Sequence, residues 1–124
     1  MDKKHTDTWF LTDKVIDHIN TCVGMQGCQE QGWCVHLSLR APHPPWVAAA
    51  PYHVRYDLDS LPLPERHDTS DEEAQTHPWL AEHILSGRNM SHEDLIKHRR
   101  LQAGYYGLMN EVDDNMGRLI AFLK

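Results

Sequence analysis

The chain has 124 residues, of which 40% are apolar and 24% charged, values typical of one folded domain rather than a disordered chain. A net charge of -6, with histidine neutral and no run of lysine or arginine, argues against nucleic-acid binding. No apolar stretch approaches the roughly 18 residues of a membrane span, and no apolar core follows Met1–His5 as in a secretory signal. Cys22, Cys28 and Cys34 form no CxxC pair, so free thiols and a cytoplasmic location are expected.

The first predicted element is a helix over residues 8–23. Trp9, Ile16 and Ile19 fall on one helical face, and Gly24 follows as a typical C-terminal stop.

A strand is predicted next, over residues 33–39, because apolar and polar side chains alternate there with a period of two. Pro42, Pro44 and Pro45 end it, since proline fixes φ and lacks an N–H. His43 stands between two of these prolines and is expected in an extended conformation. Such a loop can aim one imidazole at a ligand.

Residues 40–90 are predicted to form a proline-rich loop region with one possible short helix over 71–86. After the proline loop, Pro51, Pro62, Pro64 and Pro78 and the acidic run 68–73 break any longer periodicity. A loop of this size within a compact domain often belongs to a binding site.

The strongest periodic signal predicts a long helix over residues 91–123, with Ser91 as its N-cap. Gly104 and Gly107 are expected to bend or interrupt it. Its apolar face, interpreted as core, comprises Leu101, Tyr105, Leu108, Val112, Met116, Leu119 and Leu123.

Together these elements predict an α/β fold of which the chain holds only a part. The single strand has no neighbour, and a buried strand with both edges unpaired is costly. The last helix is still apolar at Phe122 and Leu123, where the sequence stops. We therefore expect one partial domain over residues 1–124, either a piece of something larger or a protomer that pairs strand 33–39 with another chain.

Three blocks of the sequence resemble successive parts of the sulfatase family, within the alkaline phosphatase superfamily. Among its members, the phosphonate monoester hydrolases and arylsulfatases are the most similar. The blocks are residues 10–17 (FLTDKVID), 36–46 (HLSLRAPHPPW) and 105–119 (YYGLMNEVDDNMGRL). The resemblance implies that the chain is an internal segment, a partial sulfatase-like layer of a larger α/β sandwich, and that Asp113 and Asp114 are structural.

Enzymes of this family hydrolyse sulfate, phosphate or phosphonate esters with a formylglycine nucleophile and a divalent metal. The resemblance therefore implies that His43 is catalytic and contacts the anionic ester or its leaving group; alternatively it is an exposed loop histidine. Arg40 is the substrate-binding candidate, because a guanidinium attracts an anionic ester, or else a surface charge at a strand end. Trp46 and Tyr52 either wall a pocket or hold the loop to its scaffold.

The motifs that would complete such a site are missing. No cysteine precedes x-Pro-x-Arg, and the SLPLP run at residues 60–64 lacks the arginine. Asp17 and His18 lie inside a predicted helix, so they do not match the family's Asp-His-Gly metal motif. We expect no cofactor and no metal ligands within this chain, and no turnover by the chain alone.

Two alternatives stay open. The chain could be a non-catalytic interaction module whose exposed strand pairs in a homodimer or with a partner protein. Its many histidines could instead bind a metal. However, His77 and His83 are six residues apart, as are His92 and His98, and neither pair has the spacing that places two ligands on one helix face.

Overall fold

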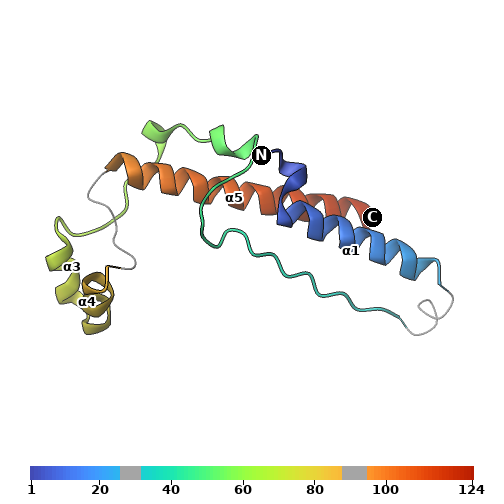
Figure 1. The fold of residues 1–124 in the computed structure, drawn as a ribbon, viewed down its shortest axis with the longest axis horizontal. Coiled ribbons are helices and arrows are strands. Elements are labelled where there is room, and N and C mark those ends of the chain that lie inside the picture. Colours follow the sequence, from blue (N-terminus) through green and yellow to red (C-terminus); the bar gives the residue numbers. More distant parts are fainter. Residues whose placement is uncertain (26–31, 88–94) are drawn as a thin grey trace.

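A computed structural model of the chain describes residues 1–25, 32–87 and 95–124, and helices make up 62% of this part. Figure 1 shows the long helix α5 (Leu95–Phe122) as the axis of the molecule, with α1 (Asp7–Val23) running parallel beside its C-terminal half. The shorter helices are η1 (Lys3–His5), η2 (Tyr52–Val54), η3 (Leu58–Ser60), α3 (Ser70–Thr76) and α4 (Pro78–Leu85).

Helix α1 begins where its sequence supplies a cap. The Thr6 hydroxyl accepts a hydrogen bond from the Trp9 N–H at 3.2 Å, and Gly24 follows the last turn. The helix predicted over residues 8–23 is therefore confirmed, and it begins at Asp7.

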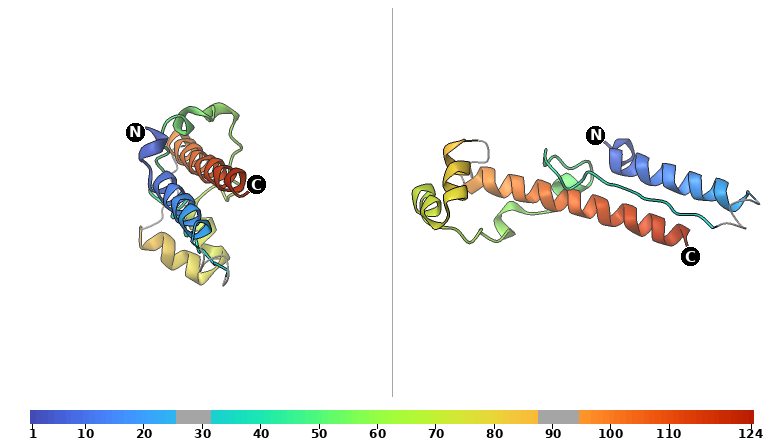
Figure 2. Two further views of the ribbon diagram at one scale, coloured as in Figure 1. Left: turned by 90° about the vertical axis from the view of Figure 1, so that its right-hand side faces the viewer. Right: turned by 90° about the horizontal axis from the view of Figure 1, so that it is seen from below.

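The strand predicted over residues 33–39 is wrong, and with it the α/β fold class. No strand occurs in the described ranges 1–25, 32–87 and 95–124. The segment passes beside α1 and α5 (Figures 1 and 2), and helices offer no free row of N–H and C=O groups for a ladder. The alternation itself is present, because Val35, Leu37 and Leu39 are half-buried whereas His36 and Ser38 are exposed. The pattern thus fixes which side chains face inward, but a strand also needs a second strand.

Helix α5 confirms the long helix, although the predicted start at residues 91–94 lies outside the described residues. The helix is not interrupted, since it continues through Gly104 and Gly107. Both glycines instead admit another segment. A Cβ on Gly104 would overlap the Trp46 carbonyl, and one on Gly107 would lie 2.7 Å from the Ala48 Cβ.

The predicted core face of α5 is only partly correct. Leu108 is buried, whereas Tyr105 and Met116 are 37% and 40% exposed. The face that α5 buries is rotated toward small and polar residues, because α1 and the segment 46–52 approach it there. The buried residues are Ala103, Gly107, Leu108, Glu111 and Asn115.

The loop region 40–90 contains two short helices, α3 and α4, where one was expected. Thr69 and Glu72 form a capping box at the start of α3. His77 precedes Pro78 and is held extended, which divides the two helices. Within the described ranges no helix has the length and apolar character needed to cross a bilayer. That the chain forms a single partial domain stays a prediction.

Candidate active site at the proline loop

The proline loop turns sharply and is tied to itself by hydrogen bonds. The His43 N–H donates to the Arg40 carbonyl at 2.9 Å, and the Trp46 indole N–H donates to the Pro42 carbonyl at 3.1 Å. The Ala41–Pro42 peptide is cis. The loop therefore places Arg40 and His43 at fixed positions on either side of one turn.

The His43 ring has one nitrogen engaged by its own loop. Nδ1 lies 2.8 Å from the Pro44 carbonyl oxygen. A carbonyl only accepts, so Nδ1 carries the hydrogen and donates it. This leaves Nε2 as the nitrogen available to a ligand, as an acceptor in the neutral ring and as a donor in the imidazolium.

Aromatic contacts fasten the loop and the chain after it to α5. The Trp46 ring meets Tyr105 edge-on, with 6.2 Å between ring centroids, and the Trp46 backbone lies on Gly104. The fully buried Tyr52 donates its hydroxyl hydrogen to Asp114 Oδ2 at 2.7 Å. Trp46 and Tyr52 thus hold the loop to its scaffold, and neither lines the cavity described below.

Burial raises the pKa of the Tyr52 phenol, and the hydrogen bond to Asp114 raises it further. The charges of Asp114 and Glu111 act in the same direction. The phenol therefore stays protonated and keeps its role as a donor that ties η2 to α5.

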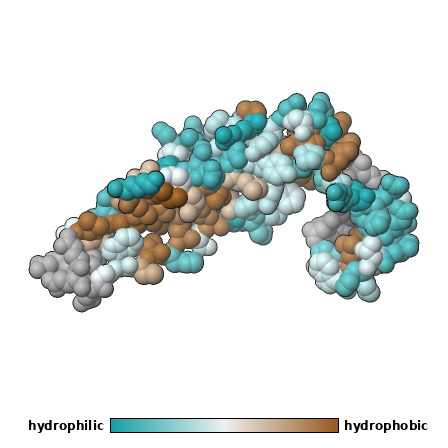
Figure 3. All heavy atoms as spheres, turned by 180° about the vertical axis from the view of Figure 1, so that it is seen from behind, coloured by the Kyte–Doolittle hydropathy of each residue, from teal (hydrophilic) through white to brown (hydrophobic). Residues whose placement is uncertain are grey.

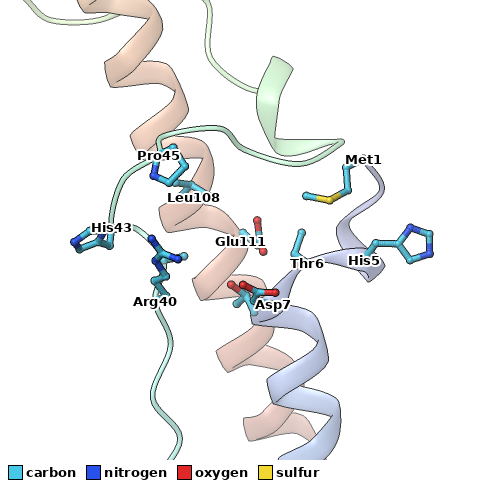
Figure 4. A pocket seen from close by; sticks show the side chains of 11 residues that line it. Met1, His5, Thr6, Asp7, Arg40, His43, Pro45, Leu108 and Glu111 are labelled. Atoms are coloured by element: carbon cyan, nitrogen blue, oxygen red, sulfur yellow. The ribbon is translucent and has the colours of Figure 1, made fainter.

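A cavity of about 280 Å³ lies between the loop, the start of α1 and the middle of α5. Figure 4 shows Arg40 and His43 on one side of it, with the His43 ring pointing away from the other labelled side chains, and Glu111, Thr6 and Asp7 on the opposite side. The structure thus brings both sequence-predicted site residues to one cavity. It also adds two carboxylates that the sequence did not single out.

Glu111 is the most unusual of these residues because it is a carboxylate with only 2% of its surface exposed. In the described part of the chain its side chain forms no hydrogen bond and no ion pair. Its position was hidden in the sequence, where it reads as a polar residue beside the predicted apolar face. The usable signal was its spacing, three residues after Leu108 and four before Asn115, on one face of α5.

The described residues do not fit a metal ion. No three His, Cys, Asp or Glu side chains among them lie close enough to hold one. His77 accepts a hydrogen bond from the Trp79 N–H, and His83 stacks on the Trp79 ring. His92 lies outside the described residues. No step of a reaction is therefore assigned to a metal held by these residues.

Known proteins match nearly the whole chain. The multifunctional alkaline phosphatase superfamily protein PehA of Trinickia caryophylli is 31% identical over 134 aligned residues, which cover 98% of this chain and 24% of that protein. The solved structure of a phosphonate monoester hydrolase from Silicibacter pomeroyi is 35% identical with a TM-score of 0.77, and covers 99% of this chain and 25% of its own. The chain thus spans about a quarter of the length of these relatives. No family model matches the chain.

Proposed function

We propose that this chain, which belongs to the alkaline phosphatase superfamily, supplies a histidine and an arginine to the hydrolysis of an anionic ester. The substrate class is a sulfuric, phosphoric or phosphonic ester. A phosphonate monoester is favoured, since that is the substrate class in the name of the structural relative. The observation that carries the proposal is the His43 ring, whose Nδ1 is engaged by the Pro44 carbonyl and whose Nε2 is left for a ligand, on a loop that lines the cavity.

His43 is suited to the departure of the leaving group. When the imidazole is protonated, Nε2–H can donate its proton to the ester oxygen as the bond from phosphorus or sulfur to that oxygen breaks. The hydrogen bond from Nδ1 to the Pro44 carbonyl orients the imidazole ring. The direction of the Nε2–H bond, along which the proton is donated, is therefore defined. The leaving group departs as a neutral alcohol, and the imidazole is left neutral.

Arg40 is suited to holding the anion. Arg40 lines the same cavity, and its backbone carbonyl accepts the hydrogen bond from the His43 N–H. A guanidinium can bind two oxygens of a phosphonate or sulfate at once, which orients the ester as well as attracting it.

We further propose that the chain alone does not turn over. It lacks the Cys/Ser-x-Pro-x-Arg motif of a formylglycine nucleophile, and its described residues do not fit the divalent metal of the family. Both would belong to a part of the reaction centre outside these 124 residues. The interaction-module alternative depended on an exposed strand, which the described residues do not contain, and it is not retained.

A chimera tests the proposal. This chain would replace the matching quarter of the Silicibacter pomeroyi hydrolase, and hydrolysis of a phosphonate monoester would be measured. His43→Gln should lower kcat by about 10²–10⁴-fold, the usual contribution of a general acid, whereas His36→Gln, exposed and outside the loop, should not. Full activity of the His43→Gln chimera would contradict the role of His43, and turnover by the isolated chain would contradict the proposed inactivity.

A further inference from the structure

The cavity beside His43 has two poles of opposite charge. Arg40 and His43 come from the proline loop, whereas Asp7 and Glu111 come from α1 and α5 on the opposite side (Figure 4). Among the described residues Arg40 forms no ion pair with either carboxylate. The positive pole is therefore not neutralised by the negative one, and both are open to a ligand.

Glu111 carries the argument for the negative pole. A carboxylate removed from water is costly unless a cation or hydrogen-bond donors replace the lost solvent. Glu111 is 2% exposed, lines the cavity, and has no such partner in the described residues. Asp7, more exposed, lies on the same side at the first turn of α1.

The chemistry favours an ammonium group over a metal ion. A dedicated calcium site takes six to eight oxygen ligands, and no group of three metal-binding side chains lies close together in the described residues. An ammonium needs only acceptors, and it has three donors to share between them. Leu108 and Pro45 line the same cavity and supply apolar contact for a short alkyl linker.

We propose that the Glu111 side of the cavity binds an ammonium group carried by the ester, so that the preferred substrates are zwitterionic amino-alkyl esters. Arg40, on the loop that carries His43, holds the anionic end, and Glu111 with Asp7 holds the cationic end. The cavity of about 280 Å³ suits a ligand of this size. This inference rests on the proposed function for its anionic end only.

Two shape-matched ligands test it on the 124-residue chain. The first is 2-aminoethyl methylphosphonate, and the second is propyl methylphosphonate, in which a methyl group replaces the ammonium. Titration followed by calorimetry or NMR should show the aminoethyl ester binding about tenfold more tightly, the effect of one charge-assisted hydrogen bond. Equal affinity of the two esters would overturn the inference.

Two variants of α5 test whether Glu111 is responsible for the preference for the aminoethyl ester. Glu111→Gln keeps the shape of the side chain but not its charge, and should bring the two affinities within about twofold, a difference of less than 0.5 kcal/mol. Asp113→Asn removes a charge from an exposed position of the same helix and should keep the tenfold preference. A preference that survives in Glu111→Gln, with the helical circular dichroism of the parent chain, would overturn the assignment to Glu111.

Propylamine separates this inference from the proposed function. It has no anionic group, so it reports on the cationic end alone through the ¹³C resonance of the Glu111 carboxylate. A saturable shift would support the ammonium site even if neither phosphonate binds, and in that case the anion-binding role of Arg40 and His43 would fail. Absence of a shift would overturn the ammonium site.

Discussion

The middle of α5 and its C-terminal end differ in how much of the helix surface other segments of this chain cover. In the middle, the segment 46–56 lies on glycines 104 and 107, and two tyrosines donate hydrogen bonds into the helix. At the C-terminal end, α1 supplies the neighbouring surface but many large apolar side chains stay exposed. Figure 3 shows the apolar surface that gathers there. The exposed residues are Val23, Met25, Trp33, Met116, Ile120 and Leu123.

The difference arises because the segment 46–56 contacts α5 through its backbone, whereas α1 contacts it through side chains. The segment 46–56 brings backbone, which can approach closely only where α5 has no Cβ. Helix α1 brings side chains, and it meets α5 through polar groups: Arg118 pairs with Asp13 and lies over the Trp9 ring. The cavity of the candidate site lies at the boundary between these two regions, so its geometry depends on the middle of α5 being well packed.

The largest expected effect is therefore at Gly104. Gly104→Val should lower the free energy of unfolding by more than about 2 kcal/mol, because the new side chain meets the Trp46 carbonyl and cannot be accommodated without moving the proline loop. Denaturant unfolding followed by circular dichroism would measure it.

Gly117→Ala is the matched control for this change. It lies in the same helix, but a Cβ there meets nothing within 4 Å. It should stabilise the chain by about 0.5–1 kcal/mol, the helix propensity of alanine over glycine. Similar effects at Gly104 and Gly117 would mean that the backbone contact does not hold the loop.

Tyr52→Phe should have a smaller effect than Gly104→Val. It removes the 2.7 Å hydrogen bond to Asp114 and leaves the ring in place. A bond to a charged acceptor contributes about 1.5–3 kcal/mol, and the loss should fall at the lower end because Asp114 is exposed and can be solvated. Equal stability of the variant and the parent chain would show that this bond contributes nothing to holding η2 on α5.

The same tyrosine predicts a dependence on pH. Burial, and then the bond to Asp114, raise the pKa of Tyr52 above its ordinary value of about 10. The folded chain keeps the phenol proton where the unfolded chain loses it, so this stability is complete below about pH 10 and is lost as the pH rises through the folded pKa. The free energy of unfolding should thus fall more steeply above about pH 10 in the parent chain than in Tyr52→Phe. Parallel pH profiles would contradict it.

The sequence predicted the helices and the loop that carries His43, but not which segments pack against them. Periodicity and caps were enough for α1 and α5, since these are local signals. The strand at residues 33–39 failed because pairing is not local: an alternating pattern tells which side chains face inward, and only a second strand makes a ladder.

In the candidate site, too, residues with a local sequence signal were predicted and those placed by tertiary contacts were not. His43 could be identified because prolines flank it on both sides, and Arg40 because it stands where the turn begins. Glu111 did not, because a polar residue in a helix is ordinarily solvated, and only tertiary contact places it at the side of a cavity. The two glycines were misread for a similar reason, since glycine weakens a helix in isolation but admits a neighbouring backbone in a fold.

A smaller effect is expected where α1 meets α5. Arg118→Met removes the ion pair with Asp13 and the contact over the Trp9 ring, and should cost about 1 kcal/mol since both partners are only partly exposed. Lys14→Met is the control, because its pair with Asp17 is 3.6 Å long and well exposed, and should cost less than about 0.5 kcal/mol. A cost for Lys14→Met as large as that for Arg118→Met would show that partial burial adds nothing here.

The smallest effect is expected at the apolar end of α5. Ile120 is 49% exposed, so Ile120→Gln loses little buried area and should change the free energy of unfolding by less than about 0.5 kcal/mol. Leu108→Ala, in the middle of the same helix and 8% exposed, should cost about 2–3 kcal/mol by the same measurement. If both substitutions cost the same, Ile120 would have to be buried in solution. The contrast between a completed middle and an open end of α5 would then be lost.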